Sequence, residues 1–235
     1  MGGSDRRGEP IVCGRFKAGF EFRDIRIRWN VLNDLYYTAH YNIAPTQIHP
    51  IVVERAGALE ARPMRWGLVP YWAKDQAIGN KMINARSETL AERPAFKDLL
   101  SSRRCLVPAD GFYEWRKEGK TKQPMLIHVK DRELFGFAGR WDRWKKPDGT
   151  LLESFTIATC APNDLMRGIH DRMPVIIQRK DESAWLDPTL KSDRVMPLLA
   201  PYPTDMMEAY PVSTLVNSPA NDSQECAEPF RDSLF

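Results

Sequence analysis

Short β-type runs separated by turn signals fill the middle of the chain and restrict its fold more than any other feature of the sequence. Turn signals stand at Gly119 and at Gly149, between runs rich in branched and aromatic residues. Strands and helices do not alternate regularly, which disfavours a doubly wound parallel sheet. The sequence therefore predicts an α+β single domain, with a mostly antiparallel β-sheet core flanked by short helices. The expected central strands are 105–108, 111–116, 125–129, 134–141 and 154–159.

The ends of the chain are expected to lie outside this domain. Residues 1–12 have little apolar content and no periodicity, which predicts a disordered leader. The domain is then expected over residues 13–225, with a tail at 226–235. A hairpin is expected around Gly57. The remaining predicted elements are strands at 51–54, 59–66, 175–178 and 212–216 and helices at 24–38, 88–101, 163–170 and 181–186.

Composition excludes several classes of protein. Among 235 residues the net charge is only +3, so any site for a polyanion must come from local clustering of basic residues. No apolar run is long enough for a membrane span, and the start of the chain does not resemble a signal peptide. We therefore expect a cytoplasmic protein that does not bind membranes. The cysteines are far apart, which predicts neither a disulfide scaffold nor a metal site, and no cofactor is expected; they are Cys13, Cys105, Cys160 and Cys226.

Residue types suited to catalysis and to phosphate binding gather in six short segments. Each has a plain structural explanation when taken alone: Cys13 as a core thiol, His170 as a hydrogen-bonded histidine, Glu114 as an outward strand position and Asn84 as a cap. Together they provide a nucleophile, two proton-transfer groups and an orienting amide. The segments are Cys13-Gly14-Arg15-Phe16, Tyr41-Asn42-Ile43-Ala44-Pro45, Ile83-Asn84-Ala85-Arg86-Ser87-Glu88-Thr89, Asp110-Gly111-Phe112-Tyr113-Glu114-Trp115, Ile169-His170-Asp171-Arg172-Met173-Pro174 and Val212-Ser213-Thr214-Leu215-Val216-Asn217-Ser218-Pro219.

These segments, in this order and together with the Trp-Gly-Leu-Val-Pro run at 66–70, resemble the SRAP family. Its members are the SOS-response-associated peptidases, which process abasic DNA. The resemblance covers the chain from Cys13 to about Asn221. It implies an SRAP-like fold and a DNA-repair protein that captures abasic sites in single-stranded DNA. It also implies a monomer that is associated with the nucleoid when it is bound to DNA.

The resemblance implies a role for each matching residue. Cys13, as the first residue, would attack the sugar aldehyde with its α-amine and close a thiazolidine ring with its thiol. Asn84 would orient the sugar or the amine, Glu114 would transfer protons, and His170 would be a second acid or base. DNA contacts are implied for Arg15, Asn42, Pro45, Trp66, Tyr71, Trp72, Arg86, Trp115 and Arg172.

Among the implied DNA contacts, Arg15, Arg86 and Arg172 would hold phosphates. The aromatic residues would stack on bases. Core packing is an equal alternative for Trp66, whereas Tyr71 and Trp72 are expected to be exposed. If the arginines serve internal ion pairs instead, the DNA path is expected over residues 140–146.

The chain departs from the family at its start, because twelve residues precede Cys13. While they are attached, the nitrogen of Cys13 is an amide and cannot form the crosslink. Three explanations remain open: translation starts at Val12, the leader is removed by self-cleavage after Val12, or the leader is permanent. The sequence favours the first, because Val12 stands where the family has methionine.

Two other classes of function remain open. An N-terminal-nucleophile cysteine amidohydrolase would use the Cys13 thiol against an amide, with its own amine as the base. A non-catalytic single-stranded DNA-binding protein, or a peptidase that only processes itself, would need no abasic substrate. Glutaminase activity would indicate the first class, and equal binding to intact and abasic DNA would indicate the second.

Overall fold

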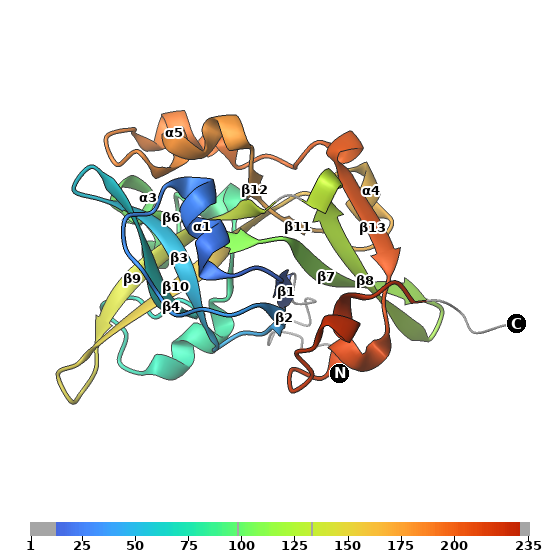
Figure 1. Ribbon diagram of the computed structural model, residues 1–235. Helices are drawn as coiled ribbons and strands as arrows, with labels where there is room; N and C mark the ends of the chain where they lie inside the picture. The colour runs from blue at the N-terminus through green and yellow to red at the C-terminus, as the bar shows by residue number, and fades with distance from the viewer. Residues whose placement is uncertain (1–12, 98, 133, 231–235) are drawn as a thin grey trace, which may run out of the picture.

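The strands form two mostly antiparallel sheets in the computed structural model, which describes residues 13–97, 99–132 and 134–230 (Figure 1). The smaller sheet has the order β13-β8-β7-β1-β2. It joins the start of the described chain to segments about 100 and 200 residues later. Its strands are β1 (Arg15–Ala18), β2 (His40–Ile43), β7 (Gly111–Glu118), β8 (Thr121–Val129) and β13 (Met207–Pro211).

The larger sheet has the order β11-β10-β4-β3-β6-β9-β12, and β5 also pairs with β10. The pairings of β10 with β4 and with β5 are parallel, and the others in this sheet are antiparallel. The predicted α+β single domain with a mostly antiparallel core is therefore confirmed. The strands are β3 (Ile48–Arg55), β4 (Ala58–Trp66), β5 (Asn84–Arg86), β6 (Arg104–Ala109), β9 (Phe135–Lys145), β10 (Leu151–Cys160), β11 (Met173–Pro174) and β12 (Ile176–Ile177).

One aromatic cluster joins the two sheets. Phe16 on β1 lies 5.1 Å from Trp66 on β4 and 6.0 Å from Phe137 on β9, measured between ring centroids. Trp66 in turn stacks on Phe155 of β10 at 6.3 Å. Buried aromatic pairs of this kind stabilise a core beyond the area that they bury. The segment around Cys13 is thus attached through Phe16 to the buried core of the molecule.

The predicted hairpin around Gly57 is confirmed. Ala56 and Gly57 both have positive φ, at 52° and 85°, as the tight turn between β3 and β4 requires. The five predicted central strands are also present, as β6 to β10, with bounds that differ by a few residues.

The helical segments are short, and α3 and α5 pack against β6 of the larger sheet. The helix α1 (Phe22–Trp29) ends at Asn30 in the left-handed conformation, so the predicted helix at 24–38 is wrong beyond that point. The predicted helix at 88–101 is divided by Pro94, and residue 98 lies outside the described part. The helical segments are α2 (Pro94–Lys97), α3 (Leu99–Ser102), α4 (Asp164–Arg167), α5 (Glu182–Leu186), α6 (Ser192–Val195), η1 (Gln76–Lys81), η2 (Ser87–Thr89), η3 (Lys130–Arg132), η4 (Arg179–Asp181), η5 (Met196–Leu198), η6 (Thr204–Met206), η7 (Thr214–Asn217) and η8 (Gln224–Ala227).

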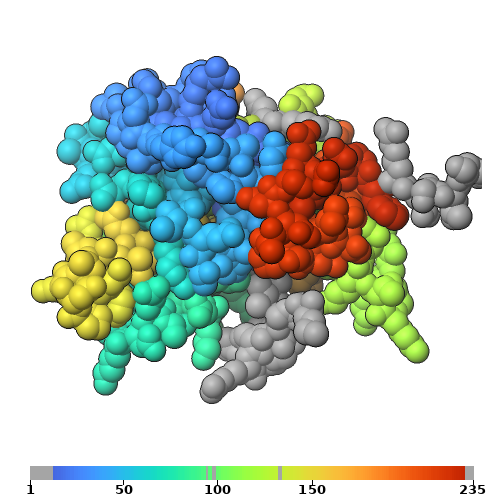
Figure 2. Space-filling model, turned by 60° about the horizontal axis from the view of Figure 1, so that its bottom comes forward, coloured from blue at the N-terminus to red at the C-terminus, as the bar shows by residue number. Residues whose placement is uncertain are grey.

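After β13 the chain folds back along β1 and β2 as a C-terminal strap, residues 212–230. The strap contains η7 and η8 and is closed at its base by a bridge between Val212 and Pro229. Figure 2 shows this red segment directly against the blue start of the chain. The predicted strand at 212–216 is therefore wrong: Ser213 caps the short helix η7 by accepting the backbone N–H of Leu215.

Candidate functional site

Cys13 lies immediately before β1, completely buried, and contacts Glu114 of β7. The antiparallel pairing of β1 with β7 places Arg15 opposite Tyr113, which brings the segment before β1 to the next residue of β7. The backbone N–H of Cys13 donates a hydrogen bond to Oε1 of Glu114, at 2.5 Å. Cys13 has a φ of 46°, which is unusual for a residue with a side chain and is typical of strained functional positions.

Glu114 is buried in a way that favours its protonated form. Burial, as the largest effect, raises its pKa to about 8, although the backbone N–H groups of Cys13 and Trp115 lower it. The carboxylate of Asp171 adds to the increase, and Lys122 opposes it. A carboxyl group that holds its proton near neutral pH is suited to acid and base catalysis.

The thiol of Cys13 is also held in its neutral form. Burial, and secondarily the charge of Glu114, raise its pKa well above the ordinary value. The thiol therefore needs a base at the moment of reaction, and Glu114, which contacts the backbone of the same residue, is a candidate.

His170 belongs to the same electrostatic neighbourhood as Glu114. Its Nδ1 lies 2.8 Å from Oδ1 of Asp171 and also accepts the backbone N–H of Arg172, at 3.2 Å. Burial lowers the pKa of His170, Asp171 raises it and Lys122 lowers it. Asp171 and Lys122 influence the pKa of both Glu114 and His170, so the charges of the two residues act on one neighbourhood. A neutral His170 can accept a proton there.

The sequence analysis did not select Asp171 or Lys122. Asp171 adjoins His170 inside a segment that was already singled out, and this position is a signal that could have identified it. Lys122 comes close only because β7 and β8 pair, with Lys117 opposite Lys122. No local pattern in the sequence indicates that proximity.

Asn84 and Arg86 lie on β5, which runs parallel to β10. Asn84 is opposite Ile157 and Arg86 is opposite Thr159. Asn84 is half-buried, and Arg86 is exposed. The strand thus fixes the two residues at one edge of the larger sheet.

Arg172 approaches the same edge but is held by protein groups. Its guanidinium makes two hydrogen bonds to the carboxylate of Glu88, at 2.7 and 2.9 Å, and another to the carbonyl oxygen of Thr159. The ion pair lowers the pKa of Glu88. Arg172 therefore carries a neutralised charge, unlike the simple phosphate-binding arginine expected from the sequence.

Arg15 and Asn42 attach the C-terminal strap to β1 and β2. Arg15 donates to the side-chain oxygen of Asn42, at 2.8 Å, and to the carbonyl oxygen of Val216, at 2.7 Å. Asn42 is 1% exposed, and its amide donates to three strap carbonyls, those of Val216, Ser218 and Asn221. The structure thus gives Asn42 an internal role in place of the expected position on the DNA surface.

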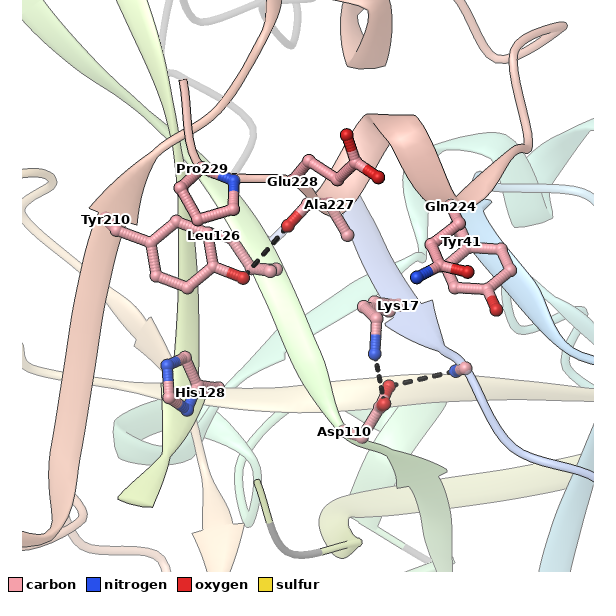
Figure 3. Close-up of a pocket in the computed structure, with 11 residues that line it drawn as sticks. Lys17, Tyr41, Asp110, Leu126, His128, Tyr210, Gln224, Ala227, Glu228 and Pro229 are labelled. Atoms are coloured by element: carbon pink, nitrogen blue, oxygen red, sulfur yellow. Dashed lines mark hydrogen bonds and ion pairs between the residues drawn. The ribbon is translucent and has the colours of Figure 1, made fainter. Parts of the chain in front are cut away.

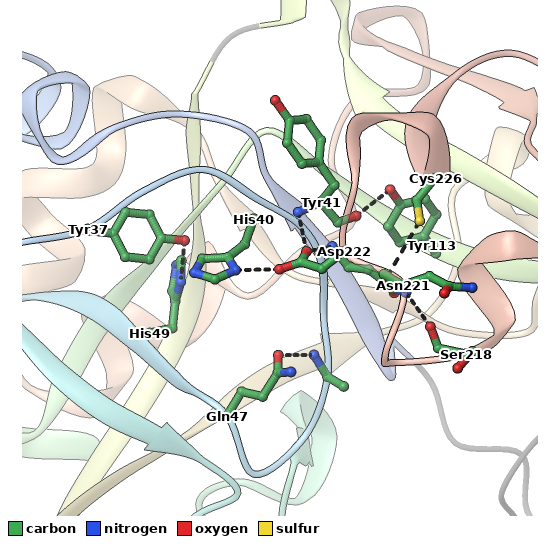
Figure 4. Close-up of polar contacts among 12 residues, drawn as sticks. Tyr37, His40, Tyr41, Gln47, His49, Tyr113, Ser218, Asn221, Asp222 and Cys226 are labelled. Atoms are coloured by element: carbon green, nitrogen blue, oxygen red, sulfur yellow. Dashed lines mark hydrogen bonds and ion pairs between the residues drawn. The ribbon is translucent and has the colours of Figure 1, made fainter.

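Asp222 and Trp115 complete the attachment of the strap. Asp222 accepts the backbone N–H groups of Tyr41 and Asn42 and lies 2.5 Å from Nδ1 of His40 (Figure 4). Trp115 donates its indole N–H to the side chain of Asn217, at 2.7 Å. Because Trp115 follows Glu114 on β7, the strap also borders the segment that holds Cys13.

The aromatic residues selected from the sequence separate into two groups. Trp66 is fully buried and donates its indole N–H to the carbonyl oxygen of Ile83, so the core-packing alternative is correct for it. Tyr71 and Trp72 are 64% and 48% exposed, and Pro45 is half-buried. The alternative path over 140–146 loses its first member, because Arg140 is buried.

Two cavities in the described part of the chain are not lined by Cys13 or Glu114. One, of about 220 Å³, is lined by Lys17, Asp110, His128 and Tyr210 among others (Figure 3). In it Lys17 and Asp110 form an ion pair. The other, of about 800 Å³, lies between α1 and α5. Neither is lined by the four predicted catalytic residues.

The described residues contain neither a cluster suited to a metal ion nor a helix suited to a membrane. In ranges 13–97, 99–132 and 134–230, no group of three or more His, Cys, Asp and Glu side chains could hold a metal ion. No helix in this part of the chain is long and apolar enough to cross a membrane.

Comparison with known proteins gives consistent matches over nearly the whole chain. The family described as SOS response associated peptidase (SRAP) matches residues 12–219. The abasic site processing protein YoqW of Bacillus subtilis is 48% identical over 222 residues, which cover 92% of this chain and 99% of that protein. The abasic site processing protein HMCES of Gallus gallus is 33% identical, over 93% of this chain and 75% of that protein.

A solved structure also matches. The crystal structure of a protein from Bacteroides thetaiotaomicron superimposes with a TM-score of 0.87 at 29% identity, covering 93% of this chain and all of that one. The fold is therefore shared with a protein whose structure is known by experiment.

Proposed function

Because the chain belongs to the SOS response associated peptidase (SRAP) family, we propose that it processes abasic sites in DNA by forming a covalent bond through Cys13. One observation carries the proposal: the backbone nitrogen of Cys13 lies 2.5 Å from a carboxyl group whose pKa is raised to about 8. When Cys13 is the first residue this nitrogen is an α-amine, and an amine beside a carboxyl group that can transfer protons is suited to reaction with an aldehyde.

The proposed reaction begins in the chain whose first residue is Cys13. Its α-amine, with an ordinary pKa of about 8, attacks the aldehyde carbon of the opened abasic sugar. Glu114 takes a proton from the nitrogen and returns one to the departing hydroxyl, so that water leaves and an imine forms. The Cys13 thiol then adds to the imine carbon and its proton moves to the nitrogen, which closes the thiazolidine ring. Ring closure is intramolecular and is favoured by high effective molarity.

The other members of the site support this reaction in the proposal. His170, whose pKa is lowered by burial, accepts a proton from the sugar and assists reversal of the crosslink. Asn84 orients the sugar or the amine from its fixed position on β5. Single-stranded DNA is held by exposed groups, principally Arg86, Tyr71 and Trp72.

Removal of residues 1–12 is part of the proposal, because an amide nitrogen cannot attack the aldehyde. Self-cleavage between Val12 and Cys13 would use the contact already described. Water would add to the carbonyl carbon of Val12, the bond from that carbon to the Cys13 nitrogen would break, and Val12 would keep the new carboxyl group. The nitrogen that leaves is the one that contacts Glu114, and a protonated carboxyl group can supply the proton that it needs. Translation from Val12, which the sequence favours, would make this cleavage unnecessary. The intact mass of the protein purified from its host measures which first residue is present.

The test is a crosslinking reaction with an oligonucleotide in which uracil-DNA glycosylase has created one abasic site. A chain verified by mass to begin at Cys13 should give a heat-stable, slower band on a denaturing gel. The chain that retains residues 1–12 is the matched control and should give none unless it cleaves itself. Cys13→Ser should lose the stable band but remain trappable by borohydride as an imine. Absence of the band from the Cys13-first chain would reject the mechanism.

A further inference from the structure

We infer that Asp142, Trp144 and Ser154 are positioning residues that hold Tyr71 and Trp72 as a preformed platform for stacking on DNA bases. Tyr71 and Trp72 are called the aromatic platform below. The inference rests on the proposed binding of DNA, but the three anchoring residues lie in the sheet and contact no part of the Cys13 site among their recorded hydrogen bonds.

The aromatic platform follows a buried stretch, which makes its exposure notable. Leu68, Val69 and Pro70 are buried, and the next two side chains are 64% and 48% exposed. Burial of aromatic side chains is favourable, so a loop free to rearrange would gain by covering them. Some feature of the structure must hold this loop in place.

Hydrogen bonds from three buried side chains supply that restraint at alternate residues of the loop. Ser154 Oγ accepts the backbone N–H of Val69 at 2.8 Å, and Asp142 Oδ2 accepts that of Tyr71 at 2.8 Å. The indole N–H of Trp144 donates to the carbonyl oxygen of Ala73 at 2.6 Å. Asp142 and Trp144 are on β9 and Ser154 is on β10, so the anchors belong to the central sheet.

The anchor Asp142 is a buried carboxylate, and both of its oxygens have hydrogen-bond partners. A carboxylate that is 2% exposed is costly unless its oxygens are satisfied. Here Arg103 lies 3.0 Å from Oδ1, and that oxygen also accepts the backbone N–H of Arg143. The other oxygen, Oδ2, accepts the backbone N–H of Tyr71. The carboxylate thus connects the sheet to the aromatic platform.

A preformed platform strengthens binding because the loop loses little conformational freedom when a base stacks on it. Loosening one anchor should therefore weaken DNA binding although the aromatic side chains remain. We expect Trp144→Phe, which removes only the indole N–H and some area, to weaken binding of an intact single-stranded oligonucleotide about two- to tenfold. Ser154→Ala should have a similar effect.

The matched control is Trp185→Phe. Trp185 is also buried and donates its indole N–H to a backbone carbonyl, that of Cys105, but it lies on α5. The Trp185→Phe substitution should lower the free energy of unfolding about as much as Trp144→Phe does, while the affinity for DNA stays unchanged. Hydrogen exchange of the Tyr71 amide should accelerate in the two anchor variants, and in Asp142→Asn, but not in Trp185→Phe.

The decisive measurement is a double-mutant cycle in the full chain. Fluorescence anisotropy measures the affinity of each variant for intact single-stranded DNA. Tyr71→Ala combined with Trp72→Ala should itself weaken binding about fivefold or more. Trp144→Phe should then cause no further loss, because the anchor acts through the platform. An equal loss in both backgrounds, or none in the parent, would overturn the inference.

Failure of the inference about the aromatic platform can be distinguished from failure of the proposed function. If the chain without aromatic platform residues binds DNA as well as the parent, the platform is no DNA contact and the inference fails. Formation of the Cys13 adduct would still test the proposed chemistry independently.

Discussion

Because Glu114 is buried, the free energy of unfolding depends on pH. The direction of that dependence follows from the pKa of Glu114. Folding raises the pKa from an ordinary 4.5 to about 8, chiefly by burial. A group whose pKa rises on folding stabilises the fold while it is protonated. That stabilisation is complete below about pH 4.5 and is lost progressively as the pH rises to about 8.

We therefore expect Glu114→Gln to become more stabilising, relative to the parent, between pH 5 and pH 8. The amide keeps the shape of the protonated acid and cannot ionise. Each unit of pKa difference corresponds to about 1.4 kcal/mol, so the relative gain should reach about 3–5 kcal/mol. Free energies of unfolding in urea at pH 5, 6.5 and 8 would measure it. A constant difference across this range would show that the carboxyl group is charged throughout.

The sequence predicted the chemistry of individual residues better than their surroundings. Cys13 and Glu114 were selected from local motifs, and the structure places them in direct contact. The core position of Trp66 and the internal contacts of Asn42 depend on segments farther along the chain, at Ile83 and in the strap. Residue type alone does not determine burial, so these two could not be assigned from the sequence.

At the scale of elements, β10 brings together two arginines that the sequence treated alike. Arg86 is exposed on β5, opposite Thr159 of β10. Arg172 precedes β11 and donates to the carbonyl oxygen of that same Thr159, while Glu88 neutralises its charge. Because Glu88 already balances the charge of Arg172, contact of Arg172 with a phosphate releases fewer counterions from DNA.

We expect Arg86→Gln to reduce the slope of log affinity against log salt by about 0.7 for single-stranded DNA. Arg172→Gln should change the slope much less and should lower stability instead, since it leaves Glu88 and Thr159 without their donor. Anisotropy titrations at several salt concentrations would compare the two variants directly. Equal changes in slope would mean that Arg172 leaves Glu88 to bind a phosphate.

The elements that the sequence predicted correctly are those with strong local signals. The turn at Gly57 and the central strands depend on turn residues and alternating side chains. The helix expected at 24–38 ends at Asn30 because Asn33 instead binds the backbone of Ala61 on β4, through both its amide and its carbonyl group. Such a tertiary contact overrides a local helical tendency.

At the scale of the whole molecule, the C-terminal strap is fastened chiefly by the buried Asn42. Asn42→Ala would leave three strap carbonyls without this donor, and we expect it to lower the free energy of unfolding by about 2–4 kcal/mol. His40→Ala is the matched control. It removes a contact to Asp222 of the same strap, but one exposed to solvent, and should cost less than about 1 kcal/mol. Urea unfolding would compare them, and similar losses would contradict the special role of Asn42.

The strap also determines when Arg15 receives its final contacts. β1 lies between a strand contributed by residues 111–118 and one contributed by residues 40–43, and residues 216 and 217 close over Arg15. The ribosome makes β1 about 200 residues before the strap. During translation Arg15 therefore emerges early and receives this cover only after the strap has emerged.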